Sequence, residues 1–162
     1  MDLLRRLVLL FCAVGSGLVA GLLFAYAVSV MPALARVDDR SFVEVMQRVN
    51  VAILNGWFLV PFVGVLAGGL LAVALHLPAA GRPALPWAAA GLALYVATLA
   101  VTGLVNVPLN DALAAAGEPA ALADPAAVRA AFETRWVTWN VVRTLTATGA
   151  LACFAWAGGI VG

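Results

Sequence analysis

The sequence predicts an all-α integral membrane protein, with one four-helix bundle that occupies residues 1–162. Composition is the first reason, because 65% of the residues are hydrophobic and 10% are charged, with a mean hydropathy of +1.06. An ordinary soluble domain carries about 25% charged residues. The second reason is that four apolar runs are long enough to cross a bilayer, and the third is that polar connections separate them.

The four runs cover residues 7–31, 51–77, 86–105 and 136–161. Arg5 and Arg6 precede the first run, as in a signal peptide, but the run exceeds the usual apolar length of such a peptide. We therefore expect it to be a retained helix. Arg82 lies in the short second connection. Because positive charges next to the first helix usually set the orientation, we expect both termini to lie in the cytoplasm.

Acidic residues concentrate in the first and third connections, which four spans place on the same side of the membrane. Seven of the eight lie there: Asp38, Asp39, Glu44, Asp111, Glu118, Asp124 and Glu133. Any chemistry of the protein is therefore expected on this side.

Both of these connections contain helix-start signals. Ser41-x-x-Glu44 is a capping-box pattern, and no Gly or Pro separates it from the second run, so a helix is expected from about Phe42 straight into that run. Asp124-Pro125 gives an N-cap followed by proline, with unbroken helical sequence into the fourth run. The even-numbered helices should therefore extend beyond the bilayer by about ten residues, or ~15 Å.

Two further patterns concern the odd-numbered helices. Asn110-Asp111 before an alanine-rich stretch predicts a short helix in the third connection. Proline follows each odd-numbered run within a few residues, at Pro32 and Pro108, which suggests two related helical hairpins.

Polar residues recur at helical spacing within the apolar runs. The third run has one stripe: Tyr95, Thr98, Thr102 and Asn106. On the fourth, one face has Trp136, Asn140, Arg143 and Thr144. The first and second runs contribute Tyr26, Ser29, Asn50 and Asn55. All lie toward the acidic connections, so the sequence predicts a polar pocket in that half of the bilayer.

Arg143 is the most informative of these residues. It lies seven residues, or ~10 Å, beyond Trp136, and a central arginine costs ~2.5–3.5 kcal/mol to insert. It must therefore meet a carboxylate, carbonyls, water or an anionic ligand. Asp111 is the expected protein partner, ahead of Asp38 and Asp39. An internal clamp that binds nothing remains an alternative.

Aromatic rings are predicted beside Arg143. Trp57, Trp136 and Trp139 would suit a flat apolar substrate, although Trp136 could also anchor the helix at the membrane interface.

Several functions are disfavoured. A net charge of +1 without any lysine argues against nucleic-acid binding. The single histidine, His76, is expected at the opposite interface, so histidine-rich metal sites lack their ligands. We expect no metal and no cofactor. Cys12 and Cys153 each lie alone in an apolar run, as buried small hydrophobes do.

Three segments, VMPAL at 30–34, PLNDAL at 108–113 and RWVTWNVVRT at 135–144, resemble the anthrone oxygenase-like membrane proteins. This resemblance implies a four-helix membrane protein and an oxidation of an anthrone to an anthraquinone with molecular oxygen. The positions that carry over are Asn110, Asp111, Trp136, Asn140 and Arg143. The lysine-free, alanine- and arginine-rich chain is similar to bacterial members, which implies a bacterial plasma membrane.

The resulting hypothesis is an oxygenase-like enzyme that acts on a small anthrone-, phenol- or quinone-type substrate without a cofactor. Asp111 would be the base, and Arg143 and Asn140 would hold the anion. The substrate-binding residues would be Trp136, Trp139, Asn106, Asn110, Asn55, Trp57 and Tyr26. The alternative is a non-catalytic lipid or quinone binder, or a partner subunit. A homo-oligomer is compatible with either.

Overall fold

A computed structural model describes residues 1–161, and these contain helices and turns but no strand. The main helices are α1 (Asp2–Ala25), α2 (Met31–Leu34), α3 (Asp39–Ala52), α4 (Gly56–His76), α5 (Leu85–Val101), α6 (Val107–Ala115) and α7 (Pro125–Val161). Two five-residue π-helices, η1 (Tyr26–Val30) and η3 (Thr102–Asn106), and two 3₁₀ turns, η2 (Ala79–Gly81) and η4 (Pro119–Ala121), connect them. The predicted all-α fold is confirmed.

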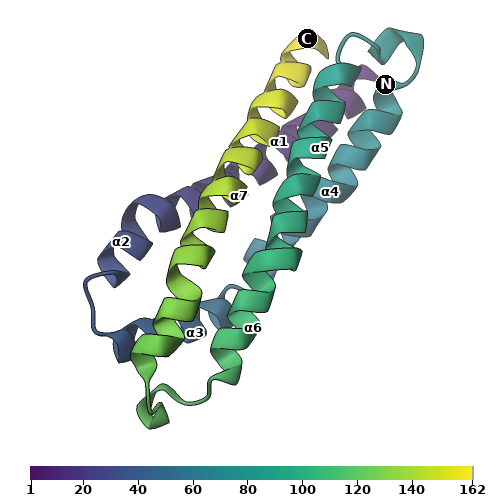
Figure 1. The fold of residues 1–162 in the computed structure, drawn as a ribbon. Helices are drawn as coiled ribbons and strands as arrows, with labels where there is room; N and C mark the ends of the chain where they lie inside the picture. Colours follow the sequence, from purple (N-terminus) through teal and green to yellow (C-terminus); the bar gives the residue numbers. More distant parts are fainter. Residues whose placement is uncertain (162) are drawn as a thin grey trace.

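Four long helical stretches, at 2–34, 56–76, 85–115 and 125–161, are apolar and long enough to cross a membrane. Their number and order match the prediction. α1 and α5 each pack against both α4 and α7, so the four helices form a closed bundle with both termini at one end (Figure 1). The protein is therefore a four-helix membrane bundle.

The odd-numbered stretches share one irregularity. In each, a five-residue π-helix ends two residues before a proline, which is the second residue of the next α-helix: Pro32 after η1 and Pro108 after η3. A proline ring clashes with the carbonyl four residues earlier, so the helix widens to i→i+5 bonds just before it. Accordingly Met31 N–H donates to the Tyr26 carbonyl, and Val107 N–H to the Thr102 carbonyl.

The short helix predicted in the third connection exists, but it is not separate. α6 begins at Val107 and continues α5 through η3 as one stretch of 31 residues. The alanine-rich sequence therefore extends the third membrane helix.

The start of α3 differs from the prediction in its cap. Asp38, and not Ser41, is the N-cap, because its carboxylate accepts the Ser41 N–H at 3.0 Å and the Ser41 hydroxyl at 2.6 Å. α3 lies across the end of the bundle opposite the termini (Figure 1).

The second helix does not run straight into the membrane, so that prediction is wrong. α3 ends at Ala52, and Asn55 starts α4 as its N-cap, accepting the Phe58 N–H at 3.2 Å. Asparagine is among the strongest N-capping residues, and this local signal ends one helix and starts another.

The fourth helix is continuous as predicted. The Asp124 carboxylate accepts the Ala127 N–H at 2.9 Å, and α7 then runs for 37 residues. At about 1.5 Å per residue it measures ~55 Å, well beyond the ~30 Å of a bilayer hydrocarbon core.

His76 is the last residue of α4, at the end opposite the acidic connections as predicted, but its side chain is buried within the protein. Its side chain is 0% exposed, and its Nδ1 lies 2.6 Å from the Ala72 carbonyl. The loop after α4 folds over it, so that a Cβ on Gly81 would lie 2.7 Å from the His76 Cα. Arg5 closes the same end by donating to the Leu75 carbonyl at 2.9 Å.

Apolar clusters occupy the bundle at three levels. One surrounds Phe154 and Val65 near the termini, and a second joins Val19 and Leu23 to Ala147. A third, built from α2, α3, α6 and α7, includes Phe42 and Phe132. Along α7, polar residues lie between the second and third clusters, so apolar side chains bound them on both sides.

Candidate functional site

Arg143 on α7 is 7% exposed, and its contacts define the site. One terminal nitrogen donates to the Asn140 Oδ1 at 3.0 Å, and the other donates to the Thr102 hydroxyl at 3.4 Å. The guanidinium carbon lies 5.3 Å from the centroid of the Trp136 ring, within cation–π range. The Nε group is buried and has no hydrogen-bond partner in the part of the chain that the structure describes.

The predicted Arg143–Asp111 pair is wrong. Among the described residues, ion pairs involve Asp2, Asp39, Glu44 and Glu133, and Arg143 takes part in none. Asp111 is exposed, whereas its neighbour Asn110 points toward α7. Adjacent helical residues differ by about 100° in direction, so both cannot face the same partner.

Asn140 fixes Arg143 within the bundle. Its side chain is fully buried, and its Nδ2 donates to the Leu23 carbonyl of α1 at 2.9 Å while its Oδ1 accepts from Arg143. One amide therefore connects α7 to α1 and holds the guanidinium in place.

Asn106 and Trp136 form the neighbouring contact. Asn106 is 1% exposed, and its Nδ2 donates to the Trp136 carbonyl at 3.3 Å. Its Oδ1 has no partner among the described residues. The Trp136 indole N–H donates to the Asn110 Oδ1 at 2.9 Å, and the Tyr26 ring centroid lies 5.9 Å from the Trp136 ring. We call Thr102, Asn106, Trp136, Asn140 and Arg143 the polar layer.

The stripe predicted on the third helix is confirmed as a contact face. Tyr95 donates to the Phe62 carbonyl of α4 at 2.9 Å, and Thr98 shares a 2.7 Å hydrogen bond with Thr146 of α7. Thr102 and Asn106 continue the face into the polar layer through Arg143 and Trp136.

The comparison with known families bears on these residues. The anthrone oxygenase family model matches residues 52–153, which is more than half of the chain. The chain belongs to the anthrone oxygenase family. The match covers the whole polar layer together with Asn110 and Asp111. No curated protein and no solved structure matches the chain.

Other predicted site residues of this family member lie outside the polar layer. Trp57 is 93% exposed on the outer side of α4, so the prediction that its ring lies beside Arg143 is wrong. Asn55 is exposed and caps α4. Trp139 is half-buried. Apolar sequence alone did not show which face of α4 turns to the lipid.

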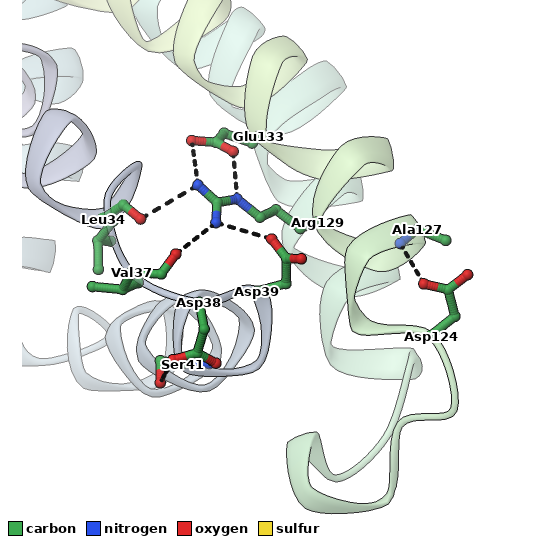
Figure 2. Close-up of polar contacts among 9 residues, drawn as sticks. All are labelled: Leu34, Val37, Asp38, Asp39, Ser41, Asp124, Ala127, Arg129 and Glu133. Atoms are coloured by element: carbon green, nitrogen blue, oxygen red, sulfur yellow. Dashed lines mark hydrogen bonds and ion pairs between the residues drawn. The ribbon is translucent and has the colours of Figure 1, made fainter.

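Sequence reasoning did not single out Arg129, which has the densest polar contacts on the acidic side. It forms ion pairs with Asp39 at 3.0 Å and Glu133 at 2.6 Å and donates to the Leu34 and Val37 carbonyls, as Figure 2 shows. Its guanidinium also lies 4.5 Å from the Phe42 ring centroid. The Arg129-x-x-x-Glu133 spacing was the available signal.

Arg40 and Gln47 add two links of the same kind. Arg40 donates to the Pro119 and Leu122 carbonyls, and Gln47 donates to the Leu113 carbonyl at 2.8 Å. With Arg129, they hold α3 against the third connection and α7, which closes the bundle below the polar layer.

Proposed function

We propose that this anthrone oxygenase family member oxidises a small aromatic substrate of the anthrone, phenol or quinone type with O₂. One observation supports the proposal most directly: Arg143 is 7% exposed and has no carboxylate partner among residues 1–161. A buried cation without a counter-charge is costly, and an anionic ligand would remove that cost. A deprotonated aromatic substrate supplies such a charge.

Arg143 would stabilise the electron-rich anion, and Trp136 would contact its ring. Asn140 already donates to the Leu23 carbonyl and accepts from Arg143, so we assign it a positioning role. Fixed charges act strongly in a site bounded by apolar clusters, because little water is present to screen them.

Asp111 is the proposed base. It lies next to Asn110, which contacts Trp136, and it is exposed, so a proton taken from the substrate can pass to water. It has no arginine partner in the described chain.

The atoms balance without a further reductant. Loss of one C–H proton gives an anion, and O₂ forms a C–O bond at that carbon to give a peroxide. Removal of the second C–H proton then breaks the O–O bond. The carbon becomes a ketone, and the other oxygen leaves as water. A methylene plus O₂ thus gives a carbonyl plus water.

Oxygen uptake by the purified protein with anthrone tests this function. We expect Arg143→Met and Asp111→Asn each to lower kcat by at least about 100-fold. Matched controls are Arg48→Met, at an exposed surface arginine, and Glu118→Gln, at an exposed carboxylate. Folded Arg143 and Asp111 variants with wild-type uptake would remove both residues from the mechanism.

A second candidate is a non-catalytic lipid or quinone binder. A groove of about 510 Å³ between α1 and α4 favours it, because its lining is almost entirely apolar: Phe11, Val14, Gly15, Leu18, Gly56, Trp57, Val60 and Pro61. Quinone binding that is lost in Trp57→Ala, together with an absence of oxygen uptake, would favour this candidate.

We further propose that both termini face the cytoplasm of a bacterium. Arg5 and Arg6 lie at the start of α1, and the exposed Arg82 directly follows η2. The start of α1 and the connection between α4 and α5 are both at the end of the bundle that holds the termini (Figure 1). A C-terminal green fluorescent protein fusion should be fluorescent in the Sec pathway, and a C-terminal alkaline phosphatase fusion inactive. The reverse pattern would invert the orientation.

A further inference from the structure

Within residues 1–161, two buried polar groups of the polar layer find no hydrogen-bond partner. One is the Arg143 Nε, a donor, and the other is the Asn106 Oδ1, an acceptor. Buried polar groups in folded proteins nearly always have partners, so each such exception calls for an explanation. Here one missing donor and one missing acceptor occur in the same layer.

The identity of the free Asn106 atom follows from its other contact. The amide nitrogen lies 3.3 Å from the Trp136 carbonyl oxygen, which can only accept a hydrogen bond. The NH₂ group must therefore face Trp136, and the carbonyl oxygen is the free atom.

The two free groups belong to one closed set of contacts. Thr102 and Asn106 lie four residues apart at the two ends of η3, and each contacts α7, at Arg143 and Trp136 respectively. Arg143 lies over the Trp136 ring, which completes the set. Both free groups therefore belong to residues that contact Trp136.

We propose that Asn106 determines ligand specificity by accepting a hydrogen bond from a hydroxyl on the aromatic ligand, while the oxygen of that hydroxyl accepts from the Arg143 Nε. This inference rests on the proposed function only in placing an aromatic ligand in the polar layer. A hydroxyl satisfies both groups with a single oxygen, whereas an ether or a ring hydrogen leaves the Asn106 carbonyl unsatisfied.

This contact also identifies which proton the substrate loses in the reaction. An amide carbonyl cannot donate to an oxyanion, so the hydroxyl at Asn106 keeps its hydrogen. The proton that leaves under the proposed function is then the C–H proton, and Arg143 balances the charge of the resulting anion.

The test compares 2-naphthol with 2-methoxynaphthalene, which have the same ring and acceptor oxygen but differ in the donor. Binding to the purified protein in detergent is measured by calorimetry. We expect the wild type to prefer the naphthol by about 10-fold or more. Asn106→Leu should reduce this preference to about that of the detergent alone. Thr138→Leu, at an exposed polar residue of α7, should retain it.

Equal binding of the two ligands to the wild type would overturn the proposal, and so would a preference that persists in Asn106→Leu. Failure of the wild type to bind either ligand would also overturn it, since the Arg143 Nε and the Asn106 Oδ1 would then bind only water. If Asn106→Leu does not fold, Asn106→Ser is compared, which is expected to bind the naphthol at least about 5-fold more weakly.

These ligands have no oxidisable methylene group, so their binding does not depend on turnover. Oxygen uptake with anthrone is measured separately on the same preparations. Intact uptake without a naphthol preference would contradict only the role of Asn106. A naphthol preference without uptake would contradict only the proposed function.

Discussion

Arg129 on α7 and Asp39 at the start of α3 form an ion pair at 3.0 Å although 90 residues separate them in the chain. The Arg129 side chain is 13% exposed, and it also bonds Glu133 and two carbonyls of the first connection. The pair therefore fixes the first connection, with α3, against the outer part of the fourth helix.

Replacement of Arg129 by Met should lower the free energy of unfolding by about 2–3 kcal/mol, because it leaves Asp39 and Glu133 without their shared cation. Thermal unfolding in detergent measures the change. Arg48→Met is the control: Arg48 is 79% exposed and pairs only with Glu44, so its loss should cost less than about 1 kcal/mol. Equal melting temperatures for the two variants would contradict the prediction.

Acid should weaken the cap of α3. Hydrogen bonds from the Ser41 hydroxyl and backbone N–H hold the pKa of the Asp38 carboxyl below its ordinary value of 3.8. The folded-state pKa is thus below the unfolded one, so this stabilisation is present above about pH 4 and is lost as the pH falls through the folded pKa.

Asp38→Asn should therefore show a smaller fall in melting temperature between about pH 6 and about pH 3 than the wild type, because asparagine caps a helix without titrating. Glu118→Gln, at an exposed carboxylate, should behave as the wild type does. An unchanged acid response in Asp38→Asn would show that the cap does not contribute to it.

The sequence predicted most of the bundle because apolar length and helical spacing are local properties. The spacing of Tyr95, Thr98, Thr102 and Asn106 placed four side chains on one face, and each bonds another helix. The continuous α7 followed from the Asp124-Pro125 start in the same way.

The partner of Arg143 was not predictable by such counting. η3 adds i→i+5 bonds before Pro108, and a π insertion turns everything after it relative to a regular helix. This rotation of the helix decides whether Asn110 or Asp111 faces α7. The exposure of Trp57 likewise depends on how α4 is rotated against α1, which an all-apolar helix does not encode.

Two glycine pairs, Gly17/Gly21 and Gly64/Gly68, have the four-residue spacing that lets membrane helices approach closely. The second pair approaches α1, since a Cβ at Gly68 would lie 2.9 Å from the Cys12 sulfur, whereas a Cβ at Gly21 would meet nothing within 4 Å. The spacing alone therefore did not distinguish a contact from a lipid-facing position.

Gly81→Ala should lower stability by about 1–3 kcal/mol, because the added Cβ would lie 2.7 Å from the His76 Cα, where backbone must move. Gly21→Ala, in α1, should be neutral or stabilising by up to about 1 kcal/mol, since alanine suits a helix better than glycine does. Unfolding in detergent compares the two variants. Equal free energies of unfolding for the two variants would mean that the loop over His76 can shift without loss of stability.

Replacement of Arg143 by Met should leave the melting temperature unchanged or raise it, in contrast to Arg129→Met. Among the described residues, Arg143 donates hydrogen bonds to the neutral Asn140 and Thr102 side chains, at 3.0 and 3.4 Å, and pairs with no carboxylate, so none is left unpaired when it is removed. Replacing a buried charge by an apolar side chain of similar length removes its desolvation cost. Thermal unfolding of Arg143→Met, Arg129→Met and the wild type in one detergent checks this. A loss as large as that of Arg129→Met would identify Arg143 as a structural clamp, whereas retained stability with lost oxygen uptake would assign its charge to the ligand.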